Sequence, residues 1–297
     1  MKKKYRVLFF GIKTYPSKGG TDRVAENLIR YLKEDFDITL FCLKEPDEIP
    51  PISDFRIIRF KPMLRGSPGA LLYFIRSAFR AMRMSFDLIH VHKTECAFFI
   101  PLLRLRHQVI ATSHEAPYLR DKWGPVERFY FRMAEKLFVR ATPKITSISE
   151  PLARYYKDRY RREVTFIPNG IDLTPAEKLN HAHLKLLLPP QALLDSPFIL
   201  FAARRLMSTK GCHLLLEALH KIRYQGQIFI AGESTHHTAY LQSLHKLAEG
   251  LNVHFIGFIH PLETMLALLS KSQLFVFPSE TEGMSIMLLE AASSRLS

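Results

Sequence analysis

The clearest cluster of side chains that could do chemistry lies in residues 277–290, FPSETEGMSIMLLE. If a helix begins at Glu282, Glu290 lies eight residues later, about two turns or roughly 12 Å along the axis. Two carboxylates so placed could hold both ends of a polyol. The backbone N–H groups of Gly283, Met284 and Ser285 would be helix-start donors suited to an anion. An ordinary helix start fits as well, because the helix dipole favours a Glu there.

A basic pair follows a predicted strand, where Arg205 precedes Lys210 by five residues and Gly211 opens the next helix. An Arg can grip a diphosphate with two parallel hydrogen bonds, and a Lys supplies a compact charge. These residues therefore predict a diphosphate clamp, while a loop with ordinary solvated charges is the alternative.

Two loops in the first half of the chain also contain residues that could bind a ligand. Gly19 and Gly20 precede a predicted helix, and adjacent glycines let backbone N–H groups approach a phosphate. A plain turn is the alternative. The loop is neither GxGxxG nor GxxxxGK, which argues against nicotinamide dehydrogenases and P-loop enzymes. His114 lies just past the carboxyl end of another predicted strand, where it could bond a hydroxyl or carry a proton near neutral pH.

His90 and His92 alternate on one predicted strand and therefore share a face. A metal site there would need a third ligand, which is not evident, so we interpret both as packing or hydrogen-bonding groups. We expect neither a metal nor another cofactor.

The positioning elements alternate between short apolar runs and longer amphipathic stretches. This alternation predicts parallel sheets with helices on both faces and ligands at the carboxyl ends of the strands. The predicted strands are 5–11, 38–43, 55–60, 88–91, 108–112, 145–147, 164–167, 198–202, 227–231, 253–256 and 274–277. The predicted helices are 22–33, 69–85, 126–140, 151–157, 212–222, 237–249, 261–269 and 283–294.

We read residues 173–197, rich in Pro, Leu, His and Ala, as a linker region. The sequence thus predicts two doubly wound, Rossmann-like domains that face a cleft, 1–175 and 176–297. The second shows only four strands where about six are common, and its last helix has no capping Gly. We therefore expect an incomplete, less stable second domain, with Leu288 and Leu289 short of packing partners.

Composition and charge limit the function classes. The chain has 297 residues, 47% of them hydrophobic, and a net charge of +14, which excludes disorder. Three Cys cannot form a disulfide framework, so a reducing cytoplasmic compartment is the default. No apolar run is long enough to span a membrane. Residues 1–175 carry a balance of +13 and residues 176–297 only +1.

Taken together, six ordered motifs resemble the retaining GT-B glycosyltransferases of family four (glycosyl transferases group 1). They cover nearly the whole chain: GG at 19–20, DLIHVH at 87–92, TSHE at 112–115, IPNGID at 167–172, RL…KG at 205–211 and EGMSIMLLE at 282–290. Residues 122–136 bear a weaker resemblance to bacterial rhamnosyltransferases of surface-polysaccharide assembly. The resemblance implies a nucleotide-diphosphate sugar as donor, bound mainly by the second domain, without a metal.

Carried over residue by residue, the resemblance implies that Arg205 and Lys210 bind the donor diphosphate, Glu290 the ribose and Glu282 the donor sugar. The backbone of residues 283–285 would support sugar and phosphate, and Gly19 and Gly20 would close over the phosphates. His114 would contact the transferred sugar. The family is described as using front-face attack, with the departing diphosphate helping to deprotonate the acceptor, so stabilising the leaving group is the protein's main contribution.

Two departures from the family pattern stand out. Arg204 occupies the place where the family usually has a Gly, which would crowd the phosphate or add a cation. The Gly-Pro-Val strand and returning helix that follow in the family are also missing here, which puts the activity of this chain in doubt.

The acceptor would be a saccharide or a lipid-linked sugar. Arg76, Arg80 and Arg83 share one face of the predicted helix 69–85, and Leu72, Ile75, Phe79 and Met82 form the other. A basic amphipathic helix favours a peripheral contact with anionic lipid on the inner face of the plasma membrane, although core packing is the alternative.

Two further hypotheses stay open. A catalytically inactive fragment would bind donor or partner only. A nucleic-acid-binding protein would fit the basic charge, but aromatic-interleaved basic stretches and recognised modules are missing, so we expect no nucleic-acid partner.

Overall fold

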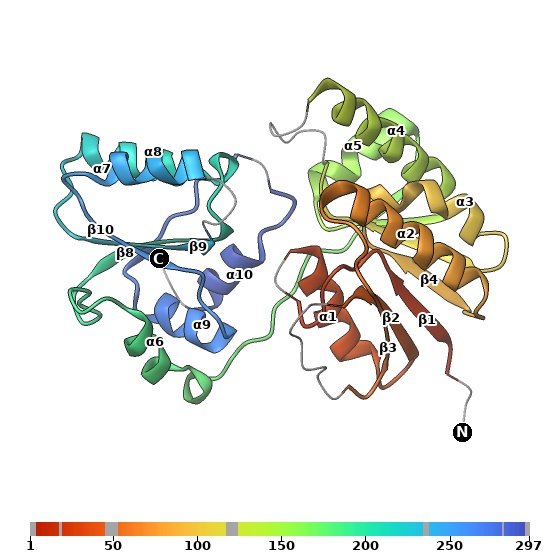
Figure 1. Cartoon of the computed structure of the whole chain (residues 1–297), viewed down its shortest axis with the longest axis horizontal. Helices are drawn as coiled ribbons and strands as arrows, with labels where there is room; N and C mark the ends of the chain where they lie inside the picture. Colours follow the sequence, from red (N-terminus) through yellow and green to blue (C-terminus); the bar gives the residue numbers. More distant parts are fainter. Residues whose placement is uncertain are drawn as a thin grey trace. The chain divides into compact units, whose positions relative to one another are not determined.

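Two parallel β-sheets organise the protein in a computed structural model that describes residues 4–17, 20–44, 53–116, 124–233, 238–280 and 282–294 (Figure 1). The chain divides into two compact units, Met1–Asn169 and Gly170–Ser297. The boundary falls slightly before the predicted one at residue 175. Each unit has its own sheet and its own buried core.

Among the residues described, the sheet of the first unit has seven parallel strands in the order β3-β2-β1-β4-β5-β6-β7. Its strands are β1 (Arg6–Phe10), β2 (Asp37–Leu43), β3 (Arg56–Phe60), β4 (Leu88–Val91), β5 (Gln108–Ser113), β6 (Lys144–Ser147) and β7 (Val164–Phe166). Central strands of a parallel sheet are covered on both faces and read as continuous apolar runs. Leu8, Phe9 and Phe10 of β1 follow this rule, because all three are fully buried.

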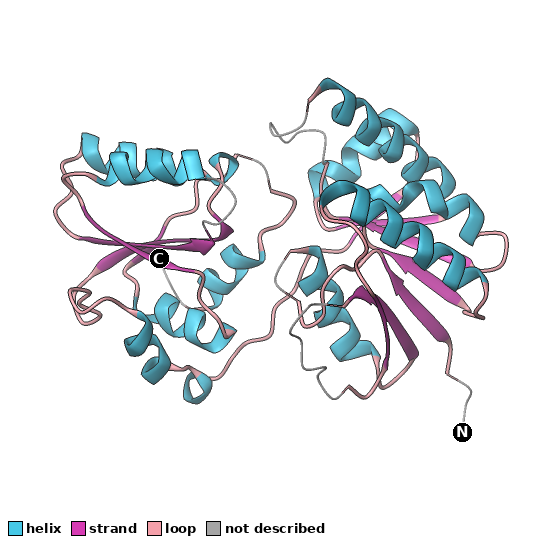
Figure 2. Cartoon of the chain, in the orientation of Figure 1, coloured by secondary structure: helices cyan, strands magenta, loops and turns pink. Residues whose placement is uncertain are grey.

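Helices cover both faces of this sheet (Figure 2). One face packs against α1 (Thr21–Leu32), through Phe9 and Ile29 among others. The helices of the other face are α2 (Gly66–Met82), α3 (Ile100–Leu103), α4 (Pro125–Ala141) and α5 (Glu150–Tyr160), with the 3-10 turn η1 (Thr94–Phe99). The predicted doubly wound arrangement is therefore confirmed for the first unit.

The second unit has a parallel sheet in the order β10-β9-β8-β11. Its strands are β8 (Phe198–Arg205), β9 (Gln227–Glu233), β10 (Asn252–Gly257) and β11 (Leu274–Phe275). One face packs against α7 (Cys212–Lys221) and α8 (Thr238–Ala248). The other packs against α6 (His181–Leu187), α9 (Leu262–Lys271) and α10 (Ile286–Ser293). The described part of this unit also contains the short 3-10 turns η3 (Ala176–Lys178) and η4 (Ser208–Lys210).

Three expectations about elements need correction. The predicted linker contains α6, which Leu184 anchors because it is fully buried against the core of the second unit. Helix α10 begins at Ile286, with Ser285 as its N-cap, and not near Glu282. Helix α2 buries Tyr73, Phe74, Ser77, Ala78 and Ala81, while Phe79 of the predicted apolar face is 56% exposed.

Candidate functional site

In the second unit, the loops that follow β8 and β11 meet at one edge of the sheet. The two strands are parallel neighbours, so their carboxyl ends lie together. Thr209 O accepts hydrogen bonds from Glu280 N and Ser279 Oγ, both at 3.1 Å. These contacts join two segments about seventy residues apart.

Gly211 makes this close approach feasible. Its φ is +74°, in the left-handed region that favours glycine. A Cβ at this position would lie 2.0 Å from the carbonyl oxygen of Pro278, which is backbone and therefore cannot rotate away. Only glycine fits here without moving one of the two loops.

Lys210 and Glu282 form an ion pair where these loops meet. Ser279 Oγ also lies 3.1 Å from the same carboxylate oxygen of Glu282. The Lys210 Nζ lies 5.7 Å from the centre of the Phe277 ring, within the range of a cation–π contact. The side chains of Lys210 and Glu282 are 28% and 27% exposed, so a ligand from solvent can reach both. The predicted diphosphate cation and sugar-binding carboxylate are thus brought together.

Arg205 ends β8, and its side chain is 47% exposed. The Arg205 Nε lies 3.9 Å from a carboxylate oxygen of Glu233, the last residue of β9. Glu233 is not among the residues that the motifs predicted for this site. The signal was present, because Glu233 directly follows the apolar run of a strand whose carboxyl end lies at the same edge.

The segment before α10 differs from the expectation. Ser285 accepts a hydrogen bond from Leu288 N at 3.4 Å and so caps the helix, while Gly283 and Met284 precede it. The N–H groups of residues 283–285 are therefore not first-turn donors of the helix. Glu282 also lies outside α10, so the predicted separation of 12 Å along one helix does not apply. Glu290 lies within α10 and is only 2% exposed.

In the first unit, His114 directly follows β5 and is 9% exposed. Its Nε2 lies 3.3 Å from Nδ1 of His92, and the two rings stack with centroids 5.5 Å apart. Burial, together with the neighbouring His90 and Lys93, lowers the pKa of His114 to about 3. The ring is therefore neutral at pH 7. Of its two predicted roles, hydrogen bonding to a hydroxyl fits, and carrying a proton near neutral pH does not.

His90 and His92 share one face of the sheet, as predicted, with ring centroids 3.9 Å apart. His90 Nε2 lies 2.7 Å from Thr112 Oγ1, which lies 2.7 Å from Thr146 Oγ1. Burial lowers the pKa of His90 to about 4 and that of His92 well below its usual value. The interpretation of both as packing and hydrogen-bonding groups is confirmed.

Gly20 is the residue that caps α1, with φ +60°, and its carbonyl accepts hydrogen bonds from Arg23 N and Val24 N. The left-handed φ explains the glycine at this position. Gly19 lies outside the described residues, so the structure does not test its predicted role.

A charged network beside this loop was not predicted. Asp22, 6% exposed, accepts hydrogen bonds from Lys13 N and Thr14 N at 3.3 and 3.1 Å, and its carboxylate lies 3.0 Å from Lys93 Nζ. Burial raises the pKa of Asp22, but the charge of Lys93 and these hydrogen bonds outweigh it, so the pKa lies below its usual value. No local pattern predicts this contact, because Lys93 lies 71 residues from Asp22.

Two properties of the described residues bear on metal sites and on membrane spans. No group of three or more His, Cys, Asp or Glu side chains there is arranged to hold a metal ion. None of the helices within the described ranges has both the length and the apolar character needed to cross a bilayer.

Family models match both units. The model described as Glycosyltransferase Family 4 matches residues 18–175, and that for Glycosyl transferases group 1 matches residues 196–297. No curated protein sequence matches the chain significantly.

Several solved structures resemble the whole chain. Sucrose-phosphate synthase from Thermosynechococcus elongatus has a TM-score of 0.75 at 20% identity, over 97% of this chain and 79% of that one. HepE from Anabaena has a TM-score of 0.72 at 16% identity, over 98% of this chain and 79% of HepE. WaaG, a glycosyltransferase involved in lipopolysaccharide biosynthesis, has a TM-score of 0.70 at 17% identity, over 98% of this chain and 79% of WaaG. These similarities show the GT-B fold.

Proposed function

Because the chain belongs to glycosyltransferase family 4, we propose that it moves a hexosyl or deoxyhexosyl group from a nucleotide-diphosphate sugar to a saccharide or lipid-linked acceptor. The transfer would retain the anomeric configuration and serve cell-surface polysaccharide or glycolipid biosynthesis. The observation that carries this proposal is the ion pair of Lys210 with Glu282 at the carboxyl edge of the second sheet. A cation for phosphate and an acceptor for sugar hydroxyls are adjacent and partly exposed there.

The roles in the second unit follow from charge. Lys210 and Arg205 would bind the diphosphate and stabilise the negative charge that develops on it as the glycosidic bond breaks. Glu282 would accept hydrogen bonds from the donor sugar, and Glu290 from the ribose. The chain segment of Gly283, Met284 and Ser285 would line sugar and phosphate.

The first unit would supply the remaining contacts. The neutral ring of His114 would hydrogen-bond the transferred sugar, and Gly19 and Gly20 would cover the phosphates. HepE was solved in complex with UDP-glucose, which supports a nucleotide-diphosphate sugar as the donor class. No metal is needed in this scheme, since the cationic side chains neutralise the leaving group.

We also propose that the protein works in the cytoplasm, as a peripheral protein on the inner face of the plasma membrane. The balance of +13 over residues 1–175 supports attraction to anionic lipid. Helix α2 exposes Phe79 and Arg80 side by side, and Arg83 follows, which combines apolar and basic contacts on one surface.

The test is a turnover screen of the full chain against UDP-, GDP- and dTDP-sugars, with a lipid extract as the source of acceptors. We expect one donor to release its nucleoside diphosphate in an acceptor-dependent reaction that Lys210→Ala abolishes. Proton NMR of the product would report its anomeric configuration. Donor binding without turnover would contradict the proposal and support the inactive, donor-binding alternative.

A further inference from the structure

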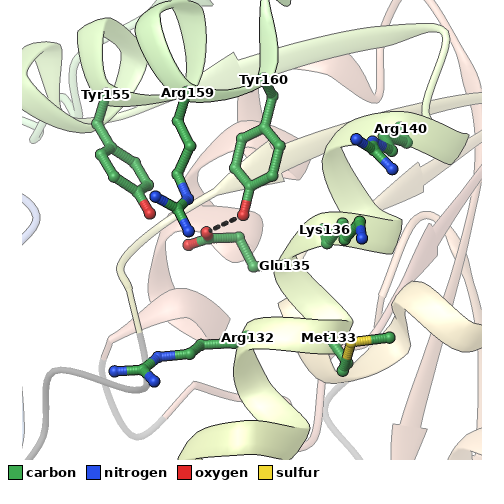
Figure 3. A pocket seen from close by; sticks show the side chains of 8 residues that line it. All are labelled: Arg132, Met133, Glu135, Lys136, Arg140, Tyr155, Arg159 and Tyr160. Carbon is green, nitrogen blue, oxygen red and sulfur yellow. Dashed lines mark hydrogen bonds between the residues drawn. The ribbon is translucent and has the colours of Figure 1, made fainter.

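A groove of about 380 Å³ lies on the helical surface of the first unit, between α4 and α5 (Figure 3). It is lined by four cationic side chains, Arg132, Lys136, Arg140 and Arg159. Lys136, Arg140 and Arg159 come from the second halves of helices that run antiparallel to the strands, and Arg132 lies near the middle of α4. The groove therefore lies toward the amino ends of the strands, whereas His114 lies at the carboxyl end of β5.

Helical spacing places three of the cations in a row. Arg132, Lys136 and Arg140 lie four residues apart, so they form one row on α4 with about 6 Å between successive positions. Like charges at this spacing destabilise a helix by a few tenths of a kcal/mol per pair. Neither Lys136 nor Arg140 forms an ion pair with any residue that the structure describes. The row thus carries an electrostatic cost that an anion would relieve.

Helix α5 supplies the opposite wall. Tyr155, Arg159 and Tyr160 all point from α5 toward α4 (Figure 3). The Arg159 guanidinium lies 6.0 Å from the ring centres of both tyrosines, which hold it over the groove. A fixed guanidinium loses less entropy when it binds an oxyanion.

A buried carboxylate fixes one of the side chains that line the groove. Glu135 is 1% exposed and accepts a hydrogen bond of 2.8 Å from the Tyr160 hydroxyl. Burial and the bond to Glu135 raise the pKa of Tyr160, so its hydroxyl keeps its proton. With four cations and one carboxylate, the groove has a balance of +3. That charge matches a phosphate or diphosphate group.

We infer that the groove between α4 and α5 is a binding site for a phosphate-type anion, separate from the proposed sugar-transfer site. Arg132, Arg140 and Arg159 would bind phosphate oxygens with paired N–H groups, and Lys136 would add a point charge. The phosphate belongs either to a soluble compound or to a lipid headgroup, since both present the same oxygens. The inference does not depend on the proposed transfer of a sugar.

The test uses the purified full chain and the double variant Lys136→Gln/Arg140→Gln. The matched control is Arg154→Gln/Lys157→Gln, which removes the same charge from exposed positions of α5 that do not line the groove. One arm titrates inorganic pyrophosphate and follows hydrogen exchange in peptides covering 132–140 and 155–160. This local readout separates the groove from any binding at Lys210. The other arm measures co-sedimentation with phosphatidylcholine vesicles, with and without phosphatidylglycerol.

We expect the groove variant to weaken one of the two interactions by about tenfold or more, relative to both the unmodified chain and the control. Loss in the pyrophosphate arm assigns a soluble ligand, and loss in the vesicle arm assigns a lipid headgroup. UDP binding should be unchanged in both variants, which distinguishes this site from the proposed donor site. Thermal melts verify that each variant folds. If the double variant Lys136→Gln/Arg140→Gln does not fold, the single variant Lys136→Gln takes its place in both arms. Equal effects of groove and control variants, or no effect in either arm, would overturn the inference.

Discussion

Lys210 and Glu282 form an ion pair although 72 residues separate them in the chain. In the free protein each therefore neutralises the charge that the other would offer to a ligand. In the proposed function, a diphosphate that binds Lys210 would compete with Glu282 and would free the carboxylate to accept hydrogen bonds from sugar hydroxyls. The pair would thus link nucleotide binding to sugar binding within one unit.

Replacing Lys210 by Ala should weaken UDP binding by about 1.5–3 kcal/mol, the range for hydrogen bonds to charged groups. Isothermal titration with UDP, GDP and dTDP would measure the loss. Lys246→Ala, an exposed position on α8, is the matched control and should bind normally. Unchanged affinity for all three nucleotides in the Lys210 variant would show that it is not part of the diphosphate clamp.

Replacing Glu282 by Gln should have the opposite effect on the nucleotide. Without the competing carboxylate, UDP should bind as tightly as before or up to about 1 kcal/mol more tightly, since a partly exposed pair contributes little more than that. Transfer of the sugar should fall, because a neutral amide accepts weaker hydrogen bonds than a carboxylate. Titration with UDP and a donor-consumption assay separate the two effects. Weaker UDP binding would contradict the competition.

Gly211→Ala should destabilise the second unit more than Gly250→Ala does. Both glycines have a left-handed φ, which costs an Ala about 1–2 kcal/mol. A Cβ at Gly250 meets nothing within 4 Å, whereas one at Gly211 would lie 2.0 Å from Pro278 O. The difference in urea midpoint between the two variants isolates the steric contact of the two loops. An equal loss of stability in the two variants would mean that the loops at Gly211 and Pro278 can move apart without destabilising the second unit.

The buried histidines predict a loss of stability in mild acid. His92 and His114 have pKa values far below the 6.5 of an unfolded chain. Below about pH 6.5 the unfolded state therefore takes up protons that the folded state does not. The contribution of these neutral rings to stability is fully present above that pH. As the pH drops below it, the free energy of unfolding falls by about 1.4 kcal/mol per pH unit for each histidine that stays neutral in the folded state.

Urea unfolding of the first unit at pH 7, 6 and 5 would measure this slope. His92→Asn should flatten it, and His220→Asn, at an exposed position, should not. A slope that is the same in all three proteins would contradict the assignment to the buried rings.

Lys93→Met should cost the first unit about 3 kcal/mol, because it leaves the Asp22 carboxylate buried without its cation. Adding Asp22→Asn to this variant should recover part of the loss, since the remaining groups are then neutral. A double-mutant cycle by chemical denaturation measures the coupling. Additive effects would show that the two side chains do not interact.

Local patterns predicted the elements well. The apolar run around Phe9 gave β1 within a residue or two at each end, and the spacing of DLIHVH gave β4 as observed. Such runs can be recognised in the sequence because the side-chain pattern of a strand or a helix repeats within a few residues. The same rule failed at α10, where Ser285 caps the helix and Glu282 lies outside it. Ser285 is itself a favoured N-cap residue, but the carboxylate at Glu282 fits a helix start as well.

The sequence by itself therefore determined which residue types follow each strand, and with them the family, the basic first unit and the candidate donor-binding residues. Only the tertiary structure decided which of those residues meet. The pairing of Lys210 with Glu282 depends on β11 lying beside β8, and that of Lys93 with Asp22 on β4 lying beside β1. The groove between α4 and α5 likewise exists because two neighbouring helices pack on one face of the sheet. Such contacts depend on strand order and packing, which bring together residues far apart in the chain, whereas a sequence pattern reports only neighbours.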